Sequence, residues 1–401
     1  MMYSYRHQPV KSLYVIVGGF WLLLRIPFWV TRNLLPTWRP RRNWSLLRSF
    51  IVALVDAAVA IMTETSPPAP EQLDKLAKTP GFSWVEPVPT ELIVGDIKRF
   101  AEMNDVQAAR AGGFWYGPKG VDSSLGQAAK PGEKVLYLFH GGGFVMGSAS
   151  PSFSPTATIA KGLLEHASGF SRLFALEYRL ASGPPLPISN PFPACFLDVL
   201  AGYYYLVHTL HFAPENIIVA GDSAGGVLAY QLVRYCTTYG DSEGCSGRLP
   251  SPLGLLLLSP SVDASLHPVP GTSMVTNRRS DYTGAWFDTR YSVFALMGKA
   301  LKESDIDRPW FSPGSKVYSD DDEGIKGVFT RFPKTMIVAG EAEMSRDCMR
   351  VLRDRMEREM GKEKVVYAEI DDAPHDFLGS TIWEPERTIA LEEIAKWVAK
   401  L

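Results

Sequence analysis

The chain is 401 residues long, is 46% hydrophobic and carries a formal net charge of −2 at pH 7. This length accommodates one large α/β domain with a lid, or two ordinary domains. The charge gives no support to a nucleic-acid partner. The four cysteines show no metal-ligand spacing and are too few for a disulfide framework. Cys236 and Cys245 are near enough in sequence to pair in an oxidising compartment, but free thiols are favoured.

The first element is an apolar stretch at residues 13–30, interrupted by Arg25 and Pro27 and followed by Arg32, Arg39, Arg41, Arg42 and Arg48. It is about long enough to cross a bilayer, although a charge near the bilayer centre costs on the order of 2.5–3.5 kcal/mol. No small-residue cleavage site follows it, which disfavours a removable signal peptide. We expect residues 1–45 to be a membrane anchor that spans the bilayer or lies in its interface. A pair of lid helices is the alternative.

Residues 48–63 continue as an apolar helical pattern, which the Pro-rich segment 66–70 ends. Residues 82–117 alternate proline, aromatic and polar residues, and we expect them to lead into a sheet, with a strand at residues 92–94. Residues 46–130 are therefore predicted to form an N-terminal cap and the segment that leads into the main domain.

Residues 135–139 form a compact apolar run typical of a buried strand, and the pattern HGGGF starts directly after it at His140. Glycine has no Cβ, so successive glycine N–H groups can point into open space and receive an anion. Alone, this pattern also fits a phosphate-binding turn. Its position, one strand and one crossover before the motif described next, favours an oxyanion hole, with His140 in a structural role.

The pattern GDSAG occupies residues 221–225, between an apolar strand at 217–220 and a helix that starts near residue 227. A serine at such a junction is held in a sharp, strained turn that exposes its hydroxyl at the end of the sheet. The amides of Ser223 and Ala224 open a helix, where unpaired N–H groups and the helix dipole favour negative charge. The pattern predicts a nucleophilic Ser223, with Asp222 as a structural partner; the alternative is a Gly-rich loop that happens to contain serine.

Strand and helix patterns alternate through most of the remaining chain, with strands predicted at 172–177, 253–258, 335–339 and 365–370. Helices are predicted at 155–167, 194–210 and 386–400, and another has Asp347 on its first turn and ends at about Met360. This alternation predicts an α/β fold with a mostly parallel central sheet and helices on both faces.

Residues 262–313 lack the alternation, so we predict a cap insertion there. Its aromatic residues are candidates for lining an acyl or alcohol pocket: Tyr282, Trp286, Phe287, Tyr291, Phe294, Trp310 and Phe311.

A serine hydroxyl needs a base to take its proton, and the base needs a carboxylate to hold its tautomer. His375 is the histidine that follows a late predicted strand in a loop, so we predict that it is the general base. The carboxylate is expected after the preceding strand, where Glu343 is preferred and Asp347 is its main competitor. Glu341 is a nearby candidate, and Asp263 is a remote one.

The motifs HGGGF, YRLA, GDSAGG and APHDF together resemble the hormone-sensitive-lipase branch of α/β-hydrolase esterases, from residue 135 to the C-terminus. The resemblance implies an α/β-hydrolase fold, a helical cap formed partly by the N-terminal region, and no cofactor or metal. It implies that Ser223 is the nucleophile, Glu343 the acid and His375 the base. The implied oxyanion-hole amides are those of Gly142, Gly143 and Ala224.

Two features depart from that family. The family's acid is usually aspartate, whereas Glu343 carries one more methylene. The acidic residue that usually follows the YRLAP motif is replaced by a Pro-rich loop at residues 182–193, which leaves the shape of the pocket open.

The predicted function is a serine carboxylic-ester hydrolase acting on a small apolar ester. Amide or formamide hydrolysis and acyl transfer by the same residues are alternatives, as is a non-catalytic ligand-binding protein. The predicted division is an anchor at 1–45, a cap and lead-in at 46–130, and a catalytic domain at 131–401 with the cap insertion near 262–313. Because the heavier basic flank of the anchor is C-terminal, the catalytic domain is expected to face the cytosol. The N-terminal segment also resembles that of membrane-associated fungal relatives, some of which serve secondary metabolism.

Overall fold

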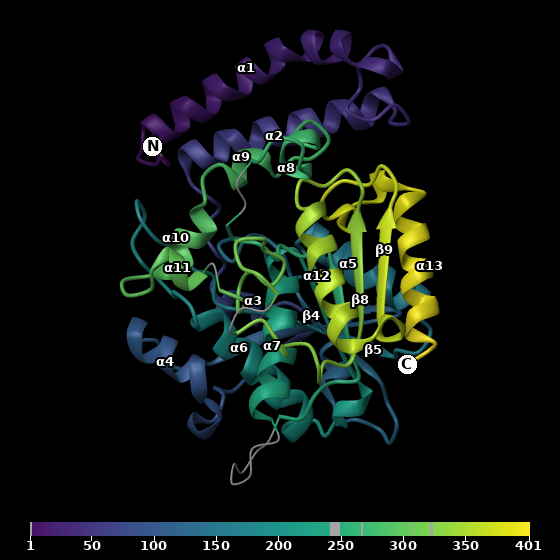
Figure 1. The fold of residues 1–401 in the computed structure, drawn as a ribbon. Coiled ribbons are helices and arrows are strands. Elements are labelled where there is room, and N and C mark those ends of the chain that lie inside the picture. Colours follow the sequence, from purple (N-terminus) through teal and green to yellow (C-terminus); the bar gives the residue numbers. More distant parts are fainter. Residues whose placement is uncertain (1, 241–248, 266–267, 307, 321–323) are drawn as a thin grey trace.

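A single mixed sheet organises the molecule in the computed structural model, which describes residues 2–240, 249–265, 268–306, 308–320 and 324–401 (Figure 1). The strand order within these residues is β1-β2-β5-β4-β6-β7-β8-β9, and the short β3 pairs with β2. Strands β1 and β2 are antiparallel to their neighbours. The other six strands of this order, β5-β4-β6-β7-β8-β9, run parallel to one another. The strands are β1 (Phe82–Val85), β2 (Ala111–Gly117), β3 (Gly120–Val121), β4 (Val135–Phe139), β5 (Arg172–Glu177), β6 (Ile217–Asp222), β7 (Gly254–Leu258), β8 (Lys334–Gly340) and β9 (Val365–Ile370).

The parallel strands are apolar along their whole length because both faces of the sheet are buried. In β4, Tyr137 and Phe139 point into one hydrophobic cluster, while Leu136 and Leu138 point into the cluster on the opposite face. The first cluster is completed by α6 (Ala194–Tyr204), α7 (Ala224–Tyr239) and α12 (Arg346–Met360), and the second by α5 (Ser154–His166) and α13 (Glu386–Val398). The predicted fold class, a mostly parallel sheet with helices on both faces, is confirmed.

A helical cap lies over the carboxyl ends of the parallel strands, as predicted. Figure 1 shows α1 outermost and α2 between it and the rest of the molecule, with α8 and α9 beneath α2. The cap therefore combines N-terminal helices with the insertion after β7. Its helices are α1 (Val10–Arg32), α2 (Leu46–Thr65), α8 (Ser273–Thr276), α9 (Gly284–Phe287), α10 (Tyr291–Met297) and α11 (Glu303–Ile306).

The segment that leads into the sheet differs from the sequence prediction. Residues 92–94 are not a strand: Thr90–Leu92 is a 3₁₀ turn, and α4 (Gly95–Asn104) begins after Ile93 and Val94. Ile97, Phe100 and Ala101 are buried at helical spacing, which decides the local structure. The strands of this region are β1 and β2, which follow the short helix α3 (Leu73–Leu76), so the sheet already begins within the predicted lead-in.

Two further boundaries shift by a few residues. Helix α7 starts at Ala224, immediately after the elbow serine, and α6 ends at Tyr204 and continues as one π-helical turn, Tyr205–Thr209. Cys245 lies outside the described residues, so a disulfide between Cys236 and Cys245 is not tested by the structure.

Candidate active site

Ser223 occupies a strained turn between β6 and α7, with φ 52° and ψ −116°. The turn is possible because glycines flank it. A Cβ at Gly221 would lie 2.1 Å from the carbonyl oxygen of Gly225, and a Cβ at Gly225 would lie 2.2 Å from the carbonyl oxygen of Phe139. Backbone packing at this density excludes any side chain at either position, and it presents the Ser223 hydroxyl to the pocket under the cap.

The loops that follow β8 and β9 bring a carboxylate and an imidazole to this hydroxyl. His375 Nε2 lies 2.9 Å from Ser223 Oγ, and His375 Nδ1 lies 2.9 Å from Glu343 Oε2. All three side chains are buried. Because the carboxyl ends of parallel strands meet at one edge of a sheet, residues 152 positions apart in sequence form one hydrogen-bonded chain.

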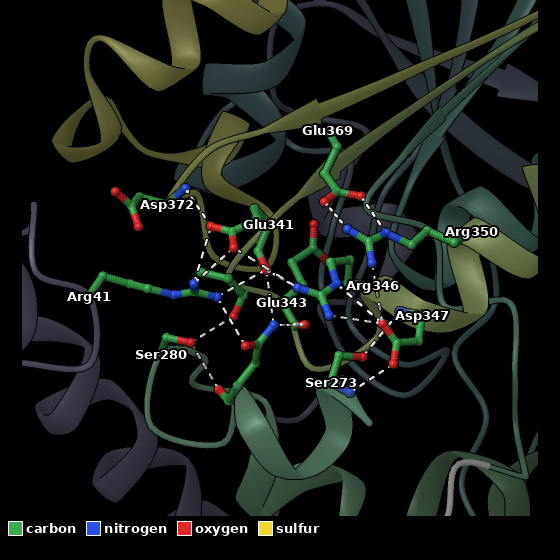
Figure 2. A network of polar contacts seen from close by, with 12 residues as sticks. Arg41, Ser273, Ser280, Glu341, Glu343, Arg346, Asp347, Arg350, Glu369 and Asp372 are labelled. Atoms are coloured by element: carbon green, nitrogen blue, oxygen red, sulfur yellow. Dashed lines mark hydrogen bonds and ion pairs between the residues drawn. The ribbon is translucent and has the colours of Figure 1, made fainter. Parts of the chain in front are cut away.

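The other carboxylates considered from the sequence have different partners. Asp347 Oδ2 accepts a hydrogen bond from Ser273 N at 2.9 Å, and Asp347 Oδ1 lies 3.0 Å from Arg346. Glu341 pairs with Arg41, and these groups form the polar network shown in Figure 2. Asp263 Oδ1 accepts hydrogen bonds from the backbone and hydroxyl of the nearby Ser265.

Three groups that the sequence reasoning did not identify hold Glu343 in place. Its Oε1 accepts hydrogen bonds from Gly340 N at 2.5 Å and from Ser259 Oγ at 2.8 Å, and its Oε2 accepts one from Ser345 Oγ at 3.2 Å. Ser261 Oγ, also missed, lies 3.2 Å from Ser223 Oγ. The signal for Ser259 and Ser261 was their position directly after β7, the strand beside β6 in the sheet.

The predicted oxyanion-hole residues Gly142, Gly143 and Ala224 line the same pocket as Ser223. Gly142 has φ +112°, and a Cβ there would lie 2.1 Å from the carbonyl oxygen of Met146, so the loop requires glycine. Within the described residues, the amide N–H groups of these three residues have no protein acceptor. They are therefore available to a ligand oxygen.

His140 and Asp222 connect the glycine loop to the elbow. His140 Nδ1 donates to the carbonyl oxygen of Gly141 at 2.7 Å, and its ring stacks on Tyr178 at 4.2 Å. Burial lowers the pKa of His140 to about 4, so its ring stays neutral. Asp222 Oδ2 accepts from Gly141 N at 2.9 Å, and burial raises the pKa of Asp222 to about 7. Both residues occupy the structural positions expected from the sequence.

The electrostatics of His375 differ from those of His140 because acidic groups surround it. Burial lowers the pKa of His375, but the carboxylates of Asp376 and Glu343 outweigh burial and raise it to about 10. Asp376 Oδ2 lies 3.3 Å from His375 Nε2, the nitrogen that also faces Ser223.

The pocket above Ser223 has a volume of about 250 Å³ and is mainly apolar. Val59 and Met62 of α2 contribute to its wall. Of the aromatic residues named as candidates, Phe294 and Trp310 do not line it. The aromatic lining is formed by Phe144, Tyr282, Trp286, Phe287, Tyr291 and Phe311.

Comparison with known proteins places this architecture in a family. A family model described as "alpha/beta hydrolase fold" matches residues 135–379, and the chain belongs to that family. A hormone-sensitive lipase structure from a metagenome library is 25% identical, with a TM-score of 0.53 over 72% of this chain and 82% of that one. These findings confirm the predicted resemblance.

Curated relatives are also esterases or hydrolases by name. An esterase of Acinetobacter venetianus is 23% identical over 70% of this chain and 80% of its own length. The carboxylesterase/phospholipase LipF of Mycobacterium tuberculosis is 33% identical over 39% of this chain. The chain spans only about a third of LipF and of an AB hydrolase superfamily protein of Schizosaccharomyces pombe, 37% and 32% of their lengths.

Proposed function

We propose that this protein is a carboxylesterase-type serine hydrolase with Ser223 as nucleophile, His375 as general base and Glu343 as the acid that orients it. The observation that carries the proposal is the continuous hydrogen-bonded chain from Glu343 through His375 to Ser223, at 2.9 Å for each contact with the imidazole. The family match and the names of the relatives support the same reaction class.

The reaction proceeds in two displacements. His375 Nε2 takes the proton of Ser223 while Oγ attacks the ester carbonyl, and the resulting oxyanion accepts hydrogen bonds from the amides of Gly142, Gly143 and Ala224. His375 then gives the proton to the alcohol as the bond to it breaks. Water loses a proton to His375 and attacks the acyl-enzyme, which releases the acid and restores Ser223.

The pocket favours a small or medium-sized apolar ester. Its volume of about 250 Å³ and its aromatic lining suit an uncharged acyl or alcohol group of limited size. The same residues support amide or formamide hydrolysis and acyl transfer, so a chain-length series of p-nitrophenyl esters, with matched anilides, is the direct way to rank these substrates.

Residues 1–45 are proposed to attach the protein to a membrane. Helices α1 and α2 are both long and apolar enough to cross a bilayer by length and composition. Helix α1 exposes large apolar side chains along its outer face: Leu13, Ile16, Val17, Phe20, Trp21, Leu23, Leu24 and Phe28. The proposed division keeps residues 46–130 as cap and lead-in and 131–401 as the catalytic domain, which faces the cytosol if the basic residues after α1 follow the positive-inside tendency.

Covalent labelling tests the proposed nucleophile. A fluorophosphonate probe is expected to label the wild type, and Ser223→Ala should abolish both labelling and p-nitrophenyl butyrate hydrolysis. The matched control is Ser261→Ala, which removes the neighbouring hydroxyl 3.2 Å away and should still be labelled. An unlabelled, inactive wild type would instead favour a ligand-binding protein.

A further inference from the structure

Asp376, the residue after the proposed base, shares the imidazole with the proposed nucleophile. Its Oδ2 is 3.3 Å from His375 Nε2, and Ser223 Oγ is 2.9 Å from the same nitrogen. One ring nitrogen cannot serve two partners in full, so an ionised Asp376 competes with Ser223 for Nε2 and favours the protonated imidazolium. A base held in that form takes no proton from serine.

The second oxygen of Asp376 has no protein partner. Asp376 lines the apolar pocket beside Ser223, and its Oδ1 is buried without a hydrogen bond to any described residue. Thr283 Oγ1, from the cap side of the same pocket, is likewise buried and unpaired within the described structure. Leaving a buried polar atom unsatisfied is costly, and polar atoms of this kind in an apolar pocket are typical of a ligand-recognition point.

The charges around Asp376 favour a partner that brings a proton or a positive charge. The titratable groups that face it are His375, Asp222, Glu343 and Asp281, and three of these four are carboxyl groups. Tyr282 stands nearby with its hydroxyl already donated to the backbone carbonyl of His375. Burial and these carboxyl groups raise the pKa of Asp376 well above its usual range, whereas the positive charge of His375 lowers it, so Asp376 is ionised only when a positive charge lies beside it.

We propose that Asp376 is a recognition residue for a hydrogen-bond donor, an ammonium or a hydroxyl group, carried by the ester substrate close to its scissile bond. This inference rests on the proposed function, because it assigns a role to a residue that contacts the proposed base. When the substrate's donor occupies Asp376, the carboxylate no longer competes for His375 Nε2. Ser223 then becomes the sole partner of that nitrogen, and a larger fraction of the imidazole is available as a base than with an ester that lacks a donor.

Matched esters that differ in a single group test this recognition. 2-(Dimethylamino)ethyl butyrate carries an N–H donor when protonated, and 3-methylbutyl butyrate is its carbon isostere. 2-Hydroxyethyl butyrate and propyl butyrate form the corresponding hydroxyl pair. Butyrate release is followed by pH-stat titration, and kcat/KM for each donor ester is divided by that for its isostere.

The wild type is expected to prefer at least one donor ester by about tenfold to a hundredfold, the range given by one hydrogen bond to a charged group. Asp376→Ala should reduce that ratio to near one because the carboxylate no longer competes for His375 Nε2, so that kcat/KM of the isostere rises. Thr283→Val should lower the ratio less. The matched control is Asp263→Asn, which neutralises another pocket-lining carboxylate and should leave the ratio unchanged.

The two pairs also separate the chemical sources of the donor. A preference confined to the ammonium pair identifies a cationic substrate, and one confined to the hydroxyl pair identifies a neutral one. No preference in the wild type, or a preference that survives in Asp376→Ala, would overturn the proposal. Hydrolysis of p-nitrophenyl butyrate by the wild type is measured in parallel, because its absence would mean that the proposed function, and not the role of Asp376, has failed.

Discussion

Arg41 holds both carboxylate oxygens of Glu341, at 3.0 and 3.1 Å, and Glu341 lies two residues before Glu343 (Figure 2). The same guanidinium donates to the carbonyl oxygen of Glu341 and to Asn277 Oδ1, both at 3.0 Å. Asn277 in turn donates to the carbonyl oxygens of Glu341 and Glu343. The segment between α1 and α2 is therefore tied directly to the turn that carries the proposed acid.

Removing the hydrogen bonds of Arg41 to Glu341 and Asn277 should affect both stability and catalysis. In Arg41→Ala, a partly buried charged hydrogen-bond set is lost, so the free energy of unfolding should fall by about 1–3 kcal/mol. Turnover should drop severalfold because Glu343 is less firmly positioned. Thermal denaturation and kcat on p-nitrophenyl butyrate measure the two effects. Arg42→Ala, which removes the exposed neighbouring arginine, should change neither; equal effects of the two variants would contradict the proposed tie.

The choice between the two acidic residues of this region is tested by an isosteric pair of substitutions. Glu343→Gln leaves the shape of the turn, but Gly340 N and Ser259 Oγ hold the amide oxygen at the Oε1 position, so that the NH2 group faces His375 Nδ1. That arrangement favours the wrong tautomer, and kcat should fall by about 10³–10⁴, as when a triad carboxylate is replaced by its amide. Asp347→Asn perturbs contacts with Ser273 and Arg346 and should cost less than about tenfold. The reverse order of effects would assign the acid to Asp347.

Residue order along the chain was enough to predict that Ser223, Glu343 and His375 lie together. The runs around β4, β6 and β8 are apolar and short, and a predicted site residue follows each of them, as His375 follows β9. The positions of Ser223, Glu343 and His375 relative to the strand ends could therefore be predicted from sequence alone. Parallel strands bury both faces, which makes their sequence signal unambiguous once helices alternate with them.

The parts that escaped prediction depend on contacts between distant segments. β2 reads AGGFWYG, and two adjacent glycines weaken its strand pattern. A Cβ at Gly112 would meet the ring of Phe82 at 2.2 Å, so the glycine serves cross-strand packing that only the pairing with β1 reveals. The supporting hydroxyl of Ser259 likewise gains its role from Glu343, 84 residues later in the chain.

The pH dependence of the enzyme should report the pairing of His375 with Asp376. Because the pKa of His375 is raised to about 10, the neutral base is scarce near neutrality and grows as pH rises. For an ester without a donor group, kcat/KM of the wild type should therefore increase from neutral into alkaline solution. This rise of kcat/KM with pH reflects the coupled titration of His375 and Asp376 and not the titration of either group alone.

Asp376→Asn should shift the rise of kcat/KM to lower pH. The substitution removes the charge of Asp376, which raises the pKa of His375, so that burial offsets more of the rise that Glu343 still causes. The variant should hydrolyse propyl butyrate faster than the wild type near neutrality and lose this advantage in alkaline solution. A pH–rate profile of kcat/KM measures the shift, and superimposable profiles of the two proteins would show that Asp376 does not control the base.

The outer face of α1 should bind lipid while lying along the membrane surface. Ile16, Phe20 and Leu24 follow one another at helical spacing and are 69%, 63% and 56% exposed. Replacing all three by glutamate should weaken co-flotation with vesicles of phosphatidylcholine and phosphatidylserine by at least about tenfold, since each buried side chain of this size contributes about 1.5–3 kcal/mol. The control places three glutamates at exposed apolar positions elsewhere, Val269, Val317 and Ile389, and should float like the wild type.

The contacts of α2 favour an α1 that lies along the membrane surface over an α1 that spans the bilayer. α1 packs along α2, and α2 is bound to the catalytic body by Arg48, 2.7 Å from Glu386, and at its start by Trp44 Nε1, which donates to the carbonyl oxygen of Asp372. A spanning α1 would have to leave α2 and uncover the face of α2 that carries Ile61, whose side chain lies against Gly18 of α1. Alkaline carbonate should therefore release the membrane-bound wild type, whereas a protein that stays in the carbonate pellet would require α1 to cross the bilayer and the cap to rearrange.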